Sequence, residues 1–375
     1  MPDWSNIRSQ FPVTYNSTYL NTAAAGPLAN ITKQAALSYY EEMTADGDIH
    51  WDEWLAKREE IRASVARFIN AEPEEVAFTT NTSNGMNLII DALESAGEVI
   101  SSALEFPVST IPWMHRRIPV HLVKARNGQA RSGDLLNRMD SRSGIISISY
   151  VQFSNGYRSD LVELGNSKGN HSLVVNASQA AGAFEIDVKR MKIDALCATG
   201  HKWMRAGYGC GFVYLSEELM SRSRARAIGW LSVEDPYAMK NDEIHLKNDA
   251  AARAEQGCPH FAGIFALGAS VNFMQSIGPS LIEAHVLELN RYLTDSLKND
   301  GWEVLSPLDD DRYRSAETLV KFDEPRKLIE ELMRQKILVT EKPQGIRVAT
   351  DLFNNTDDVD QLIKALKNFR EESKS

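Results

Sequence analysis

The sequence predicts an α/β fold in which helices cover a mostly parallel sheet. Short apolar runs rich in β-branched residues recur through the first two thirds of the chain, and segments with helical spacing of apolar residues separate them. Such alternation is typical of parallel strands, because each crossover helix returns the chain to the same end of the sheet. We therefore expect a seven-stranded sheet formed by residues 76–79, 98–104, 120–123, 144–150, 172–176, 194–199 and 210–215.

The pattern changes in the last hundred residues. We expect a long helix over 280–298, strands near 303–305, 318–322 and 345–349, and a final helix over 356–369. This predicts a large domain over 19–274 and a smaller α+β domain made of 275–375 together with 1–18.

Composition and charge point to small-molecule partners. The chain has 375 residues, with 41 Lys and Arg against 51 Asp and Glu, and its net charge is -10. Basic residues form no run, so a nucleic-acid partner is disfavoured because phosphate neutralisation needs concentrated positive charge. No apolar stretch reaches the roughly 18 residues that span a bilayer, and the N-terminus has no secretory pattern, so we expect no membrane contact and a cytoplasmic location.

Cysteine and histidine patterns give no sign of a disulfide or a metal. The three cysteines, Cys197, Cys210 and Cys258, are odd in number and widely spaced. This excludes a disulfide framework and a CxxC zinc site. The eight histidines form no HExxH motif and no tight cluster, so no metal site is predicted.

Lys202 follows a predicted strand, in the segment Thr199-Gly200-His201-Lys202, and glycines 207, 209 and 211 come shortly after it. Most lysines are simply exposed, and that remains the alternative. A lysine that binds an aldehyde cofactor needs neighbours that lower its pKa and hold the cofactor.

Three other predicted strands also end in polar or aromatic residues. Asn81-Thr82-Ser83 comes before a predicted helix whose apolar face includes Met86 and Ile90, so free amides and hydroxyls could bind a phosphate there. The alternative is that Thr82 or Ser83 caps the helix and binds no ligand. Asn176-Ala177-Ser178-Gln179 could face a ligand crevice or form a capped turn. Phe106 could stack on a ring or belong to the core.

In this order, the motifs resemble the class V aminotransferases, which are fold-type I pyridoxal phosphate enzymes that include cysteine desulfurases, kynureninase and isopenicillin N epimerase. The resemblance implies pyridoxal phosphate as cofactor, an amino acid or keto acid as substrate, and an active site at the interface of a homodimer. The similar stretches are residues 19–24, 78–87, 105–113, 174–179, 199–202, 255–268 and 346–366.

The resemblance also implies roles for single residues. Lys202 would bind the cofactor covalently and later carry the proton between substrate and cofactor, and Gln179 would bind the cofactor's phenolic oxygen. Arg347 would clamp a substrate carboxylate, a role that suits its planar fork, although a surface ion pair is the alternative. The phosphate would be held by Thr82, Ser83, Thr199 and His201, and the ring would lie against Phe106.

The sequence departs from the family pattern at Asn176. Relatives usually have an aspartate there, whose charge keeps the pyridine nitrogen protonated. Loss of a unit charge at hydrogen-bond distance forfeits about 5 kcal/mol at an effective dielectric constant of ~20. We expect a less protonated ring and a weaker electron sink.

Cysteine positions are a second departure. Residues 326–345 contain no cysteine, so the mobile nucleophile of desulfurases is missing and a desulfurase is disfavoured. Cys258 stands where relatives have a threonine that contacts the phosphate bound by the partner subunit, so we expect the thiol to weaken that contact. The alternative is a catalytic role for the Cys258 thiol. Phe153 replaces an asparagine that desulfurases place beside the cofactor.

These expectations converge on a pyridoxal phosphate-dependent enzyme that acts through Lys202, with amino transfer as the predicted reaction. Epimerisation or elimination on the same cofactor remains open. A non-catalytic, cofactor-poor protein also remains open, because of Asn176 and Cys258.

Overall fold

The computed structural model describes residues 2–372 and is built around a seven-stranded sheet. The strand order is β2-β8-β7-β6-β5-β3-β4, which confirms the predicted sheet. Strands β3, β4, β5, β6 and β7 are parallel, whereas β8 runs antiparallel to both β2 and β7. The strands are β2 (Val76–Thr79), β3 (Glu98–Ser102), β4 (Val120–Val123), β5 (Ser143–Ser149), β6 (Ser172–Asn176), β7 (Ala195–Thr199) and β8 (Gly211–Leu215).

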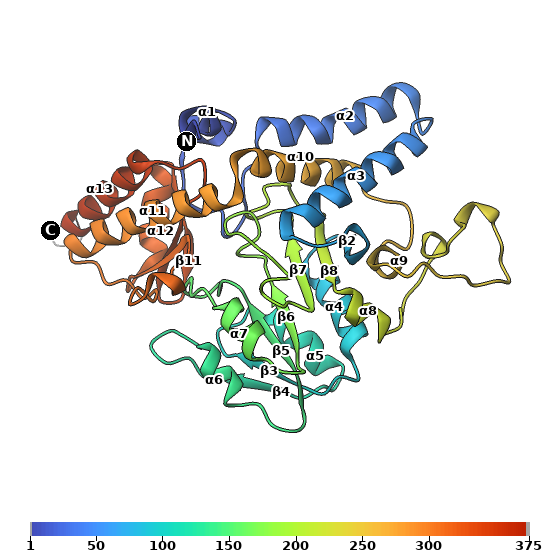
Figure 1. Cartoon of the computed structure of the whole chain (residues 1–375). Coiled ribbons are helices and arrows are strands. Elements are labelled where there is room, and N and C mark those ends of the chain that lie inside the picture. The colour runs from blue at the N-terminus through green and yellow to red at the C-terminus, as the bar shows by residue number, and fades with distance from the viewer. Residues whose placement is uncertain (1, 373–375) are drawn as a thin grey trace.

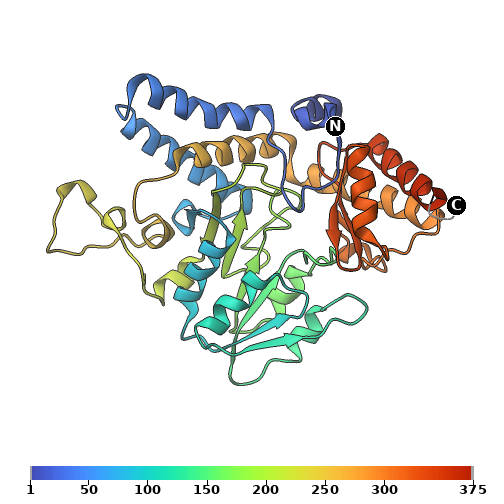
Figure 2. The ribbon, with the colours of Figure 1, turned by 180° about the vertical axis from the view of Figure 1, so that it is seen from behind.

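Both faces of this sheet are buried, because successive strand residues enter different cores. In β6, Leu173 and Val175 belong to the larger core, while Val174 between them belongs to a second core. The larger core also includes residues of α3 (Trp51–Ile69) and α10 (Phe261–Ile277), and the second includes the apolar face of α4 (Thr82–Leu93). In Figures 1 and 2, α2 (Asn30–Asp46) and α3 lie alongside α10.

The remaining helices connect strands or cover edges. The sequence did not predict α2 and α3, whose apolar periodicity is weak. Helices up to the end of the central region are α1 (Trp4–Ser9), α2 (Asn30–Asp46), α3 (Trp51–Ile69), α4 (Thr82–Leu93), α5 (Ile111–His115), α6 (Ser132–Leu136), α7 (Leu161–Ser167), α8 (Glu217–Ser221), α9 (Ala250–Ala254) and α10 (Phe261–Ile277).

The C-terminal region has its own antiparallel sheet, β11-β12-β9, and a third core. The strand expected at 303–305 is only an isolated bridge between Val304 and Val320. Its elements are α11 (Pro279–Asn299), β9 (Glu317–Lys321), α12 (Pro325–Arg334), β10 (Ile337–Leu338), β11 (Thr340–Lys342), β12 (Gly345–Ala349) and α13 (Thr356–Glu372).

The N-terminal segment lies against this C-terminal region. Strand β1 (Thr18–Tyr19) pairs in parallel with β10, and Arg8 of α1 binds Asp358 of α13. The N- and C-terminal ends accordingly lie on the same side of the molecule (Figures 1 and 2). The exact division into two domains stays a prediction.

No single helix within residues 2–372 combines the length and apolar composition needed to cross a bilayer. Helices α10 and α11 meet that test only as a pair, and an 80° bend separates them. The cytoplasmic location stays a prediction.

Candidate active site

A pocket opens at the carboxyl ends of β5, β6 and β7, beside the N-terminus of α4. Eight of the predicted site residues line it, and Arg347 and Cys258 do not. Polar strand ends of neighbouring strands meet here because the strands are parallel. The lining residues are Asn81, Thr82, Ser83, Phe106, Val108, Ser149, Val151, Phe153, Asn176, Ser178, Gln179, Thr199, His201 and Lys202.

Lys202 carries an amine that is unusually easy to deprotonate. Burial lowers its pKa to about 8, and the cations Arg347 and Lys342 lower it further against the opposing effect of Glu317. Its Nζ lies 5.9 Å from the ring centre of Phe106. A lysine with such a pKa has a substantial neutral fraction near neutral pH, so it can act as a nucleophile. The exposed-lysine alternative is therefore wrong.

Two glycines hold the Lys202 backbone by close approach. The Gly26 N–H donates to the His201 carbonyl at 2.8 Å, and a Cβ on Gly26 would stand 2.1 Å from the Lys202 carbonyl oxygen. Gly182 has φ +99° and would bring a Cβ within 2.1 Å of the Trp203 carbonyl oxygen. A side chain at either position would displace the lysine.

The start of α4 has the features of an anion-binding site. Asn81 is the N-cap, and its side chain accepts from the Asn84 N–H at 3.0 Å, so the alternative in which Thr82 or Ser83 caps this helix is wrong. The Thr82 hydroxyl instead meets the Ser178 hydroxyl at 2.7 Å. Hydroxyls and helix N–H groups therefore face the same end of the pocket.

Thr199 and His201 complete that end of the pocket. The Thr199 hydroxyl lies 2.7 Å from His201 Nδ1. Burial, and then the charge of Lys202, lowers the pKa of His201 to about 4, so the ring is neutral at pH 7. When Nδ1 accepts from Thr199, Nε2 carries the proton and can donate to an anion. The His201 ring also stacks on Tyr208, with centroids 4.5 Å apart.

Asn176 and Gln179 both have defined partners. The Asn176 amide donates to Ser109 Oγ and accepts from the Ser178 N–H, each at 3.0 Å. Gln179 donates to the Ala23 carbonyl at 3.0 Å and accepts from the Trp203 indole at 2.8 Å. One N–H of the Gln179 amide remains for a ligand.

Phe106 lies at the rim of the pocket and is 47% exposed, so the alternative in which it belongs to the core is wrong. Its ring meets the edge of Phe153 at a centroid distance of 5.1 Å. The two rings form one apolar wall of the pocket, and Lys202 Nζ lies close to the Phe106 side of this wall.

Arg347 lies behind that wall, on β12. It is 4% exposed, and its guanidinium donates to the Phe153 carbonyl at 3.1 Å and to Glu317 at 3.3 Å. The alternative of a surface ion pair is therefore wrong. Its buried Nε has no hydrogen-bond partner within residues 2–372. Its predicted role in carboxylate binding is not tested by these contacts.

Comparison with known proteins agrees with this geometry. The family Aminotransferase class-V matches residues 18–363. The chain belongs to the class-V aminotransferases. The resemblance expected from the sequence is confirmed, and pyridoxal phosphate is the cofactor of this family.

Individual class-V relatives cover most of the chain. A probable cysteine desulfurase from Methanothermobacter thermautotrophicus is 27% identical over 311 residues, which are 80% of this chain and 77% of that protein. Isopenicillin N epimerase from Amycolatopsis lactamdurans is 23% identical over 97% of this chain and 98% of its own. The apo structure of a cysteine desulfurase from Thermococcus onnurineus has a TM-score of 0.89 at 22% identity and covers 98% of both chains, which confirms the predicted fold.

The pocket fits the cofactor of the class-V aminotransferases. Hydroxyl and amide donors at its α4 end suit a phosphate, and the low pKa of Lys202 suits an amine that bonds an aldehyde. Thr82, Ser83, Thr199 and His201 would hold the phosphate.

The three cysteines lie away from the pocket. Cys197 and Cys210 are buried, and burial raises the pKa of each thiol to about 12. Cys258 is exposed and borders a separate depression with Gly209 and His260. Its predicted contact with a partner's phosphate stays a prediction. Among residues 2–372 no group of His, Cys, Asp or Glu is arranged to hold a metal.

Sequence reasoning missed three charged residues around the pocket, which are Glu105, Glu317 and Lys342. The Glu105 carboxylate accepts from the Ser149 N–H and from the Gln152 amide, both at 2.6 Å, and burial raises its pKa. Charged residues are usually exposed, so no pattern in the sequence indicated that these three lie beside a pocket. The pairing of β9, β11 and β12 places Glu317 and Lys342, and hydrogen bonds to Ser149 and Gln152 place Glu105.

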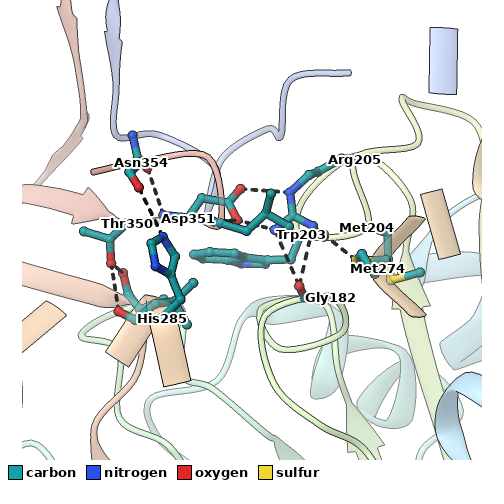
Figure 3. Close-up of polar contacts among 12 residues, drawn as sticks. Gly182, Trp203, Met204, Arg205, Met274, His285, Thr350, Asp351 and Asn354 are labelled. Carbon is teal, nitrogen blue, oxygen red and sulfur yellow. Dashed lines mark hydrogen bonds and ion pairs between the residues drawn. The ribbon is translucent and has the colours of Figure 1, made fainter. Parts of the chain in front are cut away.

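A buried ion pair anchors the segment that follows Lys202 (Figure 3). Arg205, with φ +49°, binds Asp351, which follows β12, through two nitrogens, one of them at 3.0 Å. The same guanidinium donates to the Trp203 carbonyl at 2.6 Å and to Met274 Sδ at 3.2 Å. The Lys202 segment is thus fixed to the C-terminal region.

Proposed function

We propose that this chain is a pyridoxal phosphate-dependent enzyme that transfers the amino group of an amino acid. The observation that carries the proposal is one pocket with a low-pKa lysine at its centre and a hydroxyl-lined helix start at one end. Membership of the class-V family supports it.

The chain's own residues would perform three tasks. When bound, the cofactor supplies an electron sink for negative charge at the substrate α-carbon. Thr82, Ser83 and His201 hold its phosphate, while Arg347 orients the substrate by its carboxylate. Lys202 Nζ would hold the cofactor by its aldehyde and, once displaced by the substrate amine, would take the proton from the substrate α-carbon and deliver it to the cofactor.

Asn176 sets the strength of the electron sink. Its amide has no charge and is tied to Ser109 and Ser178, so it does not stabilise a protonated pyridine nitrogen as a carboxylate would. We expect Asn176→Asp to speed the half-reaction with amino acids. An unchanged or lower rate with several amino acids would contradict this role.

A panel of amino acids tests the proposal. The protein is loaded with pyridoxal phosphate and followed by absorbance, and the products are then analysed. Transfer yields a keto acid and an aminated cofactor in equal amounts. Lys202→Ala should bind cofactor without a covalent link and show no turnover, whereas Lys33→Ala, on α2, should behave as the parent. Absence of cofactor binding by the parent protein would overturn the proposal and support a non-catalytic protein.

Cleavage of a carbon–sulfur bond by elimination is a second candidate. Relatives named cysteine desulfurase favour it. Residues 326–345 contain no cysteine, Cys197 and Cys210 are buried, and the exposed Cys258 borders a separate depression that Lys202 does not line. Sulfur would therefore leave as a free product and not on this chain. Release of sulfide and ammonia with unaminated cofactor would identify elimination. Inversion of the amino acid without keto acid would identify epimerisation.

We also propose a homodimer with the site at its interface. The segment between α8 and α9 stands out from the body of the molecule (Figure 1) and exposes apolar side chains that a partner could cover. Light scattering should give twice the mass of one chain. Ile244→Asp should lower the measured mass toward that of a monomer. A parent protein that is monomeric at all concentrations would contradict the dimer. The exposed apolar residues of this segment are Ile228, Trp230, Tyr237, Met239, Ile244 and Leu246.

A further inference from the structure

Three charged residues share one face of the small antiparallel sheet. Arg347 pairs with Thr340 on β11 and with Leu319 on β9. Lys342 and Glu317 each lie two positions from those partners, and residues two apart on a strand share a face. The opposite face packs into the third core through Val320, Ile346 and Val348.

The polar capacity of this cluster is only partly used. Glu317 binds Arg347 with one carboxylate oxygen, and its other oxygen is buried without a partner among the described residues. Within residues 2–372 the Lys342 ammonium forms no ion pair, and it lies 4.5 Å from the ring centre of Phe153. A buried polar group without a partner is costly, so the cluster is arranged for a ligand.

The cluster borders the pocket through Phe153. That residue lines the pocket with its ring and accepts from Arg347 with its carbonyl, while Lys342 lies against the ring face. A substrate held near Lys202 therefore extends toward both cations.

Charge balance then limits what fits. Arg347 and Lys342 contribute two positive charges and Glu317 one negative charge, so the cluster offsets a single carboxylate. We propose that Lys342 joins Arg347 in binding the substrate carboxylate and that Glu317 rejects a second one, which selects amino acids with an uncharged side chain. This inference rests on the proposed function and names its substrate class.

Two ligands that differ by one carboxylate test the inference. Propanoate and succinate are titrated into the cofactor-loaded protein by calorimetry, a readout independent of turnover. The parent should bind propanoate at least about tenfold more tightly than succinate. Lys342→Met should weaken propanoate binding about tenfold, and Glu317→Gln should reduce or reverse the preference.

Matched controls come from an exposed ion pair in the same region. Lys321→Met and Glu303→Gln alter charges that lie on the surface, so both should keep the parent's preference. Equal or tighter binding of succinate by the parent would overturn the inference, as would an unchanged preference in Glu317→Gln. If Glu317→Gln does not fold, Lys342→Met decides, because its side chain is half-exposed; unchanged propanoate binding there would overturn the inference.

Failure of the proposed function is distinguishable from failure of this inference. A protein that takes up no pyridoxal phosphate fails the former, and the same titration of the cofactor-free protein still reports the charge cluster. A protein that takes up cofactor but shows no preference between the two carboxylates fails only the latter.

Discussion

Two buried arginine–carboxylate pairs, Arg205–Asp351 and Arg347–Glu317, differ in how completely their polar atoms are hydrogen-bonded. Arg205 uses Nε and both terminal nitrogens, and its partner Asp351 also accepts from the Leu352 N–H at 2.6 Å (Figure 3). Arg347 uses one nitrogen, at 3.1 and 3.3 Å, and leaves Nε without a partner among residues 2–372.

The difference separates a structural pair from a binding one. A fully satisfied pair in the protein interior holds two segments together and has no capacity left for a ligand. A pair with spare donors and acceptors, placed beside a pocket, can exchange contacts when a substrate arrives. The Arg205 pair therefore positions the Lys202 segment, and the Arg347 pair is available for recognition.

The largest expected effect comes from the satisfied pair. Arg205→Met leaves the Asp351 carboxylate buried without its cation, so the free energy of unfolding should fall by about 3–5 kcal/mol. Urea denaturation followed by tryptophan fluorescence measures this. Asp351→Asn should cost a similar amount, and a loss below about 1 kcal/mol in both variants would remove the contrast between the pairs.

Arg347→Met should affect substrate more than stability. Loss of a charge-assisted carboxylate contact should raise KM about 100-fold, or roughly 3 kcal/mol. The pKa of Glu317 is raised by burial, so in this variant the carboxyl can take up a proton, and the stability cost should shrink as pH falls. If Arg347→Met lowers the free energy of unfolding as much as Arg205→Met does and leaves the KM of the folded protein unchanged, the Arg347 pair is structural and does not bind substrate.

The two pairs also differ in their influence on Lys202, because only the Arg347 cluster is coupled to its charge. Covalent uptake of pyridoxal phosphate requires the neutral amine, so its rate should rise with pH and level off above about 8. Lys342 lowers the pKa of Lys202, so Lys342→Met should move the midpoint to higher pH. Stopped-flow absorbance between pH 6 and 10 measures this midpoint. An unchanged midpoint in Lys342→Met would show that Lys342 does not influence the pKa of Lys202.

The smallest effect belongs to an exposed pair. Lys321 and Glu303 meet at 2.8 Å on the surface, where solvent screens the attraction. Lys321→Met should change the free energy of unfolding by less than about 0.5 kcal/mol. A larger change would contradict the explanation that burial makes the loss of the Arg205–Asp351 pair costly.

Patterns along the chain were sufficient where a local signal coincides with a strand end. The apolar run before Thr199 and the glycines after it marked Lys202, and the run before Asn81 marked the polar turn at the start of α4. Six of the seven predicted strands begin and end within one residue of the observed ones, because most of these strands are buried, continuous apolar runs.

Residues whose role depends on pairing could not be predicted this way. Glu317 and Lys342 lie 25 residues apart and meet only through the register of β9, β12 and β11. Arg205 gives no local sign that its partner is Asp351. The sequence did not predict α2, because this helix packs against α10 without a regular apolar stripe that would mark it as a helix.

The pairing of β1 with β10 bears on how the chain acquires its site during synthesis. The ribosome delivers Lys202 and Gly26 early, but β1 must wait for residues 337–338, and Arg205 must wait for Asp351. Contacts of such long sequence separation form slowly. A nascent chain that stalls before Asp351 would contain residues 81–83 and Lys202, yet the Arg205 guanidinium would have no carboxylate partner in the future core. Lys202 is therefore expected to become fixed in one late step, and truncated chains are expected to be substrates for quality control.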